Sequence, residues 1–168
     1  MNERSQPEPR SEPGTPQLVV GHDGHAVSHA ALNAAVDLAG RLGAHLHVVH
    51  SVTVEDYGID PDTEEFEQTR DRNLAEERLG IARGLGESGV GWTYHEEHGD
   101  PAVQLARLAD ETDALYIVVG ATHRGLMHLN GSVSKRLLHL QARPVLVIPD
   151  PATVSGLRQQ SHAGHRHR

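Results

Sequence analysis

The chain has 168 residues, enough for one domain of ordinary size with short tails. Its formal net charge of −8 argues against a nucleic-acid-binding surface, which needs clustered Lys and Arg. The absence of cysteine excludes disulfides, thiolate catalysis and cysteine-ligated zinc, and no apolar run approaches the roughly 20 residues of a membrane span. Residues 1–15 are polar and proline-rich, without the apolar core of a secretory signal, so we expect a cytoplasmic protein.

The first half of the chain alternates short apolar runs with helical patterns. Residues 17–21 predict a buried strand, and residues 27–42 predict a helix with one apolar face that ends at Gly43 as its C-cap. Residues 46–52 predict a second strand, and residues 64–85 predict a long, charged helix. Four of its apolar side chains are expected to face inward: Phe66, Leu74, Ile81 and Leu85.

The second half continues the alternation. Val90, Trp92 and Tyr94 alternate with polar residues, which predicts a strand with one face exposed to solvent. Asp100 and Pro101 are typical of a helix start, as N-cap and first helical residue, and this helix is expected to end near residue 111. Three further elements follow, namely an apolar strand at 115–119, a helix at 132–141 and a strand at 144–148.

Five strands alternating with four helices predict a three-layer, doubly wound α/β domain of Rossmann-like type, with a parallel sheet covered on both faces. The chain is expected to divide into a disordered tail at 1–15, the domain at 16–150, and a disordered, histidine-rich tail at 151–168. In such sheets a ligand binds beyond the carboxyl ends of the strands, where the strand order reverses. Asp23, His50 and Gly120 converge there if the first and fourth strands flank that point.

The loop between the fourth strand and the last helix is rich in glycine. Gly120 ends the apolar strand, Gly125 lies within the loop, and residues 131–132 open the helix. Free N–H groups at a helix N-terminus after such a loop attract anions. The Walker A spacing is present, but Leu126 replaces its lysine, and no GxGxxG fingerprint follows the first strand. The alternative is that these glycines only serve tight turns.

Several separate motifs occur in register along the chain, namely Val19-Val20-Gly21-His22-Asp23-Gly24, Gly99-Asp100-Pro101-Ala102, Val118-Val119-Gly120, Gly131-Ser132-Val133-Ser134 and Arg143-Pro144-Val145-Leu146-Val147-Ile148. Together these motifs resemble the universal stress protein family. The resemblance covers about residues 17–149. It implies a five-stranded parallel sheet in the order 3-2-1-4-5, like that of the adenine-nucleotide alpha hydrolases, together with homodimers and, in one branch, ATP binding.

The ATP-binding branch resembles the pattern G-x2-G-x9-G-[ST], and this chain departs from it. Gly120 matches the first glycine, and residues 131–132 match the end of the motif. His123 stands at the second glycine, and only seven residues separate it from Gly131, so the loop is two residues short. Residues 124–125 resemble the Arg-Gly that usually follows the second glycine.

The resemblance implies ATP, with magnesium, as the ligand of a stress-responsive regulatory module. Asp23 would face the ribose or the metal ion, and Gly21 and Val49 would line the nucleoside pocket. The full set of expected contact residues is Gly21, Asp23, Val49, Gly120, His123, Arg124, Gly125, Gly131, Ser132 and Val133. The alternative for Asp23 is to cap the helix that follows it.

The loop departures leave a second possibility open for the whole chain, a nucleotide-free structural or interaction dimer. No catalytic residue is predicted, because no general base with a partner and no phosphate-binding lysine lie near the loop. We expect slow ATP hydrolysis at most. An adenylating or electron-transfer relative is a third class, but His25 alone does not make an adenylation motif.

The last apolar run predicts the partner. Residues 144–149 are apolar on both faces, yet the family topology places them at a sheet edge, where a bare apolar strand invites aggregation. Symmetric pairing with a second copy resolves this conflict, so a homodimer is expected through Val145, Leu146, Val147 and Ile148. The alternative is that the chain's own tail covers the strand.

The chain contains 14 histidines. His45 and His47 alternate onto one side of the second predicted strand, near His50, and His95 and His98 lie around the third. No ligand set with carboxylate support is evident from the sequence. We therefore predict hydrogen-bonded or solvated histidines and no metal site.

Overall fold

A computed structural model describes residues 14–52, 64–121, 133–140 and 143–151. It contains five strands and four helices that alternate along the chain. The strands are β1 (Gln17–His22), β2 (His45–Val52), β3 (Trp92–His98), β4 (Tyr116–Gly120) and β5 (Val145–Ile148). The helices are α1 (Ala26–Leu42), α2 (Glu64–Gly86), α3 (Pro101–Glu111) and α4 (Val133–His139). Residues 1–13 and 152–168 of the predicted tails, and the loop at 122–132, lie outside the described residues.

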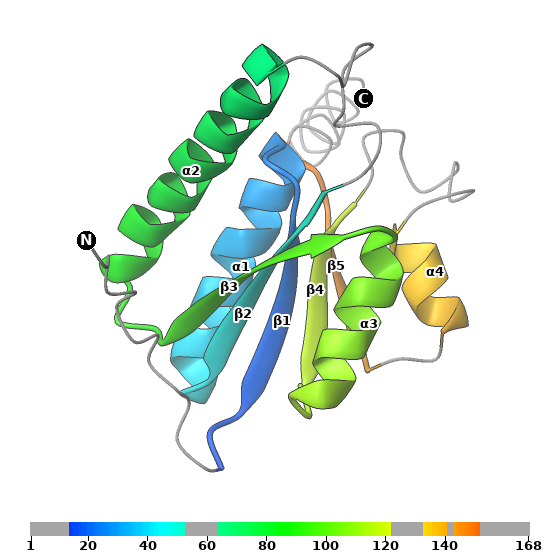
Figure 1. The fold of residues 1–168 in the computed structure, drawn as a ribbon. Coiled ribbons are helices and arrows are strands. Elements are labelled where there is room, and N and C mark those ends of the chain that lie inside the picture. Colours follow the sequence, from blue (N-terminus) through cyan, green and yellow to red (C-terminus); the bar gives the residue numbers. More distant parts are fainter. Residues whose placement is uncertain (1–13, 53–63, 122–132, 141–142, 152–168) are drawn as a thin grey trace, which may run out of the picture.

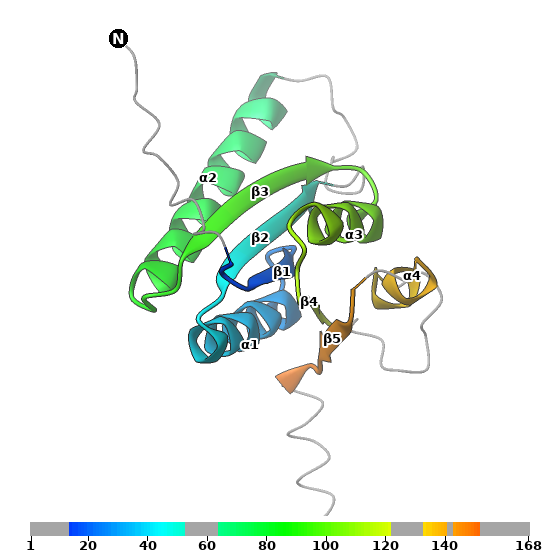
Figure 2. The same ribbon diagram turned by 90° about the horizontal axis from the view of Figure 1, so that it is seen from below.

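All neighbouring strands pair in parallel, and their order in the sheet is β3-β2-β1-β4-β5. Helices α1 and α2 cover one face of the sheet, and α3 and α4 cover the other (Figures 1 and 2). Since β1 and β4 are neighbours, the strand order reverses between them. The predicted three-layer α/β fold and its strand order are confirmed.

The two faces of the sheet contribute to separate hydrophobic cores. Leu18 and Val20 of β1 pack with α1 and α2, in a core that also holds Ile81 and Leu85 of α2. Val19, between them, packs on the opposite face with α3 and α4. This alternation follows from the period of two along a strand. It also confirms the inward orientation of Ile81 and Leu85, whereas the side chains of Phe66 and Leu74 lie outside the description.

The helix-terminus predictions are confirmed in detail. Gly43 adopts the left-handed conformation, with φ of 61°, and its backbone N–H bonds the carbonyl of Ala39. Asp100 caps α3, and its side chain accepts hydrogen bonds from the backbone N–H groups of Ala102 and Val103. Both motifs satisfy backbone groups that a helix end would otherwise leave without partners.

The strand boundaries differ from the predictions by one or two residues, and two of these differences change the place of an apolar side chain. β3 begins at Trp92, so Val90 lies outside the strand, although it packs against the α1–α2 core. β4 begins at Tyr116, and Leu115 is exposed because it lies in the turn that precedes the strand. The last helix spans Val133–His139 among the described residues, within the predicted 132–141.

Candidate functional site

The predicted site lies where the carboxyl ends of β1 and β4 meet. Val20 pairs with Val118, so the next two residues of each strand reach the same edge of the sheet. Gly120, the last residue of β4, is pressed against the first turn of α1. A Cβ at this position would lie 2.7 Å from Val27 Cγ1 and 3.0 Å from the Val27 carbonyl oxygen. Gly120 therefore has a packing role, whether or not it also approaches a ligand.

Three predicted contact residues lie on the α3–α4 face of the sheet. Gly21 pairs with Val49 across β1 and β2, and a Cβ on Gly21 would lie 3.2 Å from Leu105 Cδ1 of α3. Val49 is buried in the α3–α4 core, and Val133, the first residue of α4, packs against the same core. The fold therefore brings Gly21, Val49 and Val133 to one side of the strand-order reversal.

Asp23 follows β1 directly and is solvent-accessible, with 67% of its side chain exposed. Its carboxylate Oδ1 accepts a hydrogen bond of 3.1 Å from the backbone N–H of His25. Partial burial opposes ionisation, but hydrogen bonds from Ser28 and His25 lower the pKa of Asp23 below its usual value. Asp23 is thus an ionised oxygen donor at neutral pH, which is the type of ligand that Mg²⁺ prefers.

The alternative role of Asp23 as a helix cap is wrong. The N-cap of α1 is His25, and no side chain caps this helix. The Asp23 carboxylate bonds the N–H of the N-cap residue itself, whereas a capping side chain must accept from the second or third helical residue.

The phosphate-binding half of the prediction falls outside the described residues. This half comprises His123, Arg124, Gly125, Gly131 and Ser132.

The same edge of the sheet carries a cluster that the sequence analysis missed. His22 ends β1 and pairs with His50 of β2, and both residues are buried on the face covered by α1 and α2. Their Nδ1 atoms lie 2.6 and 3.2 Å, respectively, from the same oxygen, Oε1 of Glu77 on α2. Burial alone would raise the pKa of Glu77, but hydrogen bonds from His22 and His50 lower it to about 2.

The alternation of side chains between the two faces of each strand predicts part of this cluster. Leu18, Val20 and His22 share one face of β1, and Leu46, Val48 and His50 share the same face of β2. Glu77 could not be assigned to them, because only the packing of α2 decides which of its many acidic residues meets the sheet.

The opposite face of β2 and β3 carries a separate histidine network. His45 bonds Thr93 at 2.8 Å, and His47 bonds both His95 and Gln17 at 2.9 Å. Burial lowers the pKa of His47 to about 4, with smaller contributions from His95 and His45. These histidines are hydrogen-bonded as predicted. The face of β3 that was predicted to be exposed to solvent is only partly exposed, since Thr93 and His95 are half-buried in this network.

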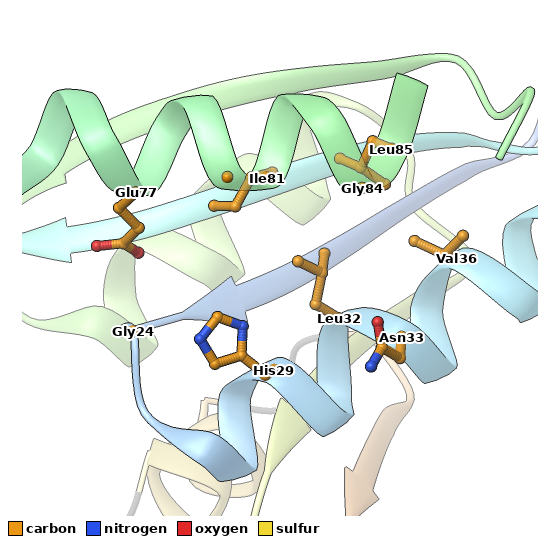
Figure 3. Close-up of a pocket in the computed structure, with 10 residues that line it drawn as sticks. Gly24, His29, Leu32, Asn33, Val36, Glu77, Ile81, Gly84 and Leu85 are labelled. Atoms are coloured by element: carbon orange, nitrogen blue, oxygen red, sulfur yellow. The ribbon is translucent and has the colours of Figure 1, made fainter. Parts of the chain in front are cut away.

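A groove of about 480 Å³ lies between α1 and α2. Figure 3 shows His29 of α1 and Glu77 of α2 among its labelled side chains, with Gly24 close to Glu77. Its lining residues are Gly24, His29, Leu32, Asn33, Val36, Glu77, Gly80, Ile81, Gly84 and Leu85. Of the predicted nucleotide-contact residues, those that the structure describes do not line this groove.

Among the described residues, no helix is both long enough and apolar enough to cross a membrane.

Comparison with known proteins gives a consistent assignment. The sequence model of the universal stress protein family matches residues 15–149. No curated protein matches the chain. Among solved structures, a protein of the universal stress protein family from Burkholderia pseudomallei is 30% identical, with a TM-score of 0.59, over 79% of this chain and 95% of that chain.

Two other solved structures share the fold at lower identity. A universal stress protein in complex with cAMP is 22% identical, with a TM-score of 0.61, over 81% of this chain and 98% of that chain. The universal stress protein from Archaeoglobus fulgidus in complex with dAMP is 23% identical, with a TM-score of 0.55, over 80% of this chain and 97% of that chain. The family match spans nearly all of the described residues, and so the chain belongs to the universal stress protein family.

Proposed function

We propose that this chain binds an adenine nucleotide, ATP with magnesium, at the carboxyl ends of β1 and β4. One observation carries the proposal: an ionised, exposed Asp23 stands beside the reversal of strand order, where Gly21, Val49 and Val133 share one side. Related structures in complex with cAMP and dAMP, both adenine nucleotides, support the same ligand class. As a regulatory module, the protein would change its protein contacts under stress when the site fills.

Each part of the proposed site has a distinct role. Gly21 and Val49 form an apolar floor for the nucleoside, and Asp23 offers oxygens to ribose hydroxyls or to magnesium. His123, Arg124 and the N–H groups of residues 131–132 would hold the phosphates. The shortened loop gives fewer backbone donors than the family pattern, so the two basic side chains take a larger share of phosphate binding.

Calorimetric titration of the full chain with ATP and magnesium tests the site. Replacing Asp23 with alanine is expected to weaken ATP binding about tenfold or more, because a hydrogen bond to a charged group contributes roughly 1.5–3 kcal/mol. Asp37→Ala is the matched control, since Asp37 is an exposed carboxylate of α1 that pairs with Arg41 one turn along the same helix. It should leave the affinity unchanged.

The outcome separates the two functions left open by the sequence. Absence of binding at millimolar ATP would remove the nucleotide proposal and leave a nucleotide-free interaction dimer. Equal affinities of the Asp23 and Asp37 variants would remove Asp23 from the site while leaving nucleotide binding in place.

We also propose that the protein is a homodimer paired through β5. This strand is at the edge of the sheet, and Leu146 and Val147 are exposed in the protomer. Leu138 and Leu140, at the end of the adjacent α4, are exposed as well. An apolar edge strand with exposed leucines beside it favours burial against a second copy.

Light scattering after size-exclusion chromatography tests the interface. The wild type is expected to elute as a dimer and Val147→Asp as a monomer, because burying an unpaired carboxylate is strongly unfavourable. Val103→Asp is a close control, since Val103 of α3 is 42% exposed and Val147 is 40% exposed. A wild-type monomer, or a Val147→Asp dimer, would contradict pairing through β5.

A further inference from the structure

The His22–His50–Glu77 cluster has the composition and compactness of a metal site. One potential ligand atom from each residue lies within 4.8 Å of the other two. His22 and His50 are buried and pair across the adjacent strands β1 and β2, and Glu77 reaches them from α2. The backbone registers of β1 and β2 hold the two imidazoles side by side, so the donors are positioned before any ion arrives.

We propose that His22, His50 and Glu77 bind one divalent transition-metal ion, for which zinc is the best fit. Two imidazole nitrogens and one carboxylate oxygen form a donor set that Zn²⁺ accepts with a fourth position left open. Calcium and magnesium fit poorly, because they prefer all-oxygen ligands. The site is independent of the proposed nucleotide crevice, since Asp23 and the residues of the α3–α4 face do not belong to it.

Two of the three spacings are near those that zinc requires, and the third, between the two imidazoles, is within 4.8 Å. Tetrahedral bonds of about 2.0–2.1 Å place ligand atoms about 3.3 Å apart. The 3.2 Å separation between His50 Nδ1 and Glu77 Oε1 already meets this spacing. The 2.6 Å separation between His22 Nδ1 and the same oxygen must widen by about 0.7 Å, which the flexible side chain of Glu77 can supply.

A neighbouring histidine can orient the first ligand. His22 Nε2 lies 3.3 Å from Nδ1 of His29, and the two rings meet edge to face. Without an ion, the Nδ1–H of His22 donates to the Glu77 carboxylate. A metal ion at Nδ1 replaces this proton, and His22 then carries its proton on Nε2, which donates to His29. Such outer hydrogen bonds fix the tautomer of ligating histidines, and their loss commonly weakens metal binding 10–100-fold.

The groove between α1 and α2 supplies access. His29 and Glu77 both line it (Figure 3), so the groove reaches the carboxylate of the cluster and the histidine beside it. A Cβ on Gly24 would lie 3.5 Å from Oε2 of Glu77, which places the second carboxylate oxygen against the turn that follows β1.

The test is a competition titration with zinc and a chromophoric chelator, on the full chain. Because the histidine-rich tail can bind metals weakly, His162, His165 and His167 are first replaced together by Gln in all samples. This background is expected to bind one equivalent of zinc. Cobalt should give the visible absorption of a low-coordinate site, and zinc should displace it.

Variants then locate the ion. Glu77→Gln keeps the side-chain shape and is expected to weaken zinc binding by about 100-fold or more, and His29→Ala by about tenfold. Glu76→Gln is the matched control, because Glu76 is an exposed neighbour on α2 and carries the same charge. It should bind like the background.

Three results would overturn the proposal. The first is a background that binds no zinc, which needs no variant and so does not depend on whether any variant folds. The second is a folded Glu77→Gln variant, judged by circular dichroism, that binds zinc as tightly as Glu76→Gln. The third is a cobalt spectrum typical of six-coordinate ions on exposed histidines.

Discussion

Replacing Gly120 with alanine is expected to lower the free energy of unfolding by about 3 kcal/mol. The added methyl group would lie 2.7 Å from Val27 Cγ1 and 3.0 Å from the Val27 carbonyl oxygen. Val27 is buried and β-branched, and the carbonyl belongs to the first turn of α1, so neither can move without shifting the helix. Overpacking of this kind typically costs 1–3 kcal/mol, and a backbone clash lies at the upper end.

Urea denaturation of the wild type and Gly120→Ala measures this loss. Gly80→Ala is a control of opposite sign, because a Cβ at Gly80 would meet nothing within 4 Å inside helix α2. It is expected to stabilise the protein by about 0.5–1 kcal/mol through the higher helix propensity of alanine. If Gly120→Ala were as stable as the wild type, the close approach of α1 to β4 would be incorrect.

Stability is expected to fall as the pH drops from about 6.5 to 4, because of His47. Its pKa in the folded protein is about 4, against an ordinary value of 6.5. Between these values the unfolded chain takes up a proton that the folded protein does not. The stabilisation is therefore fully present above pH 6.5 and is lost as the pH falls toward 4, by up to about 3 kcal/mol.

The measurement is the free energy of unfolding at several pH values for the wild type and for His47→Gln. Glutamine retains hydrogen-bonding capacity and has no titrating group, so the variant should lose less stability than the wild type over this range. His98→Gln is the control, because His98 is an exposed residue at the end of β3, and it should follow the wild type. Identical pH profiles for the wild type and His47→Gln would exclude His47 as the cause.

The local elements followed from the sequence because their signals are local. The left-handed C-cap at Gly43 and the Asp100–Pro101 helix start depend on residues within one turn, and both are present. The strands were found from short apolar runs, which remain apolar whichever face they bury. The strand order came from the family resemblance and not from periodicity, since spacing along a chain does not specify which strands become neighbours.

In the candidate site, too, the sequence predicted the positions of residues at strand ends, and the fold determined their contacts. The sequence placed Gly21, Asp23 and Gly120 at strand ends, and the fold brings those ends to one edge of the sheet. The role of Gly120 in close packing depends on the tertiary structure, which brings Val27 of α1 into contact with it.

The sequence alone established the family, the alternation of strands and helices, and the positions of the chemically distinctive residues, because these depend on neighbours along the chain. Only the tertiary structure decided that His22 and His50 both hydrogen-bond the same carboxylate oxygen of Glu77. It also decided that His45, His47 and His95 form a separate network on the other face. The reason is physical: the side chain that crosses from a helix to a sheet is selected by the rotation and distance of that helix, which are set by core packing across the whole domain.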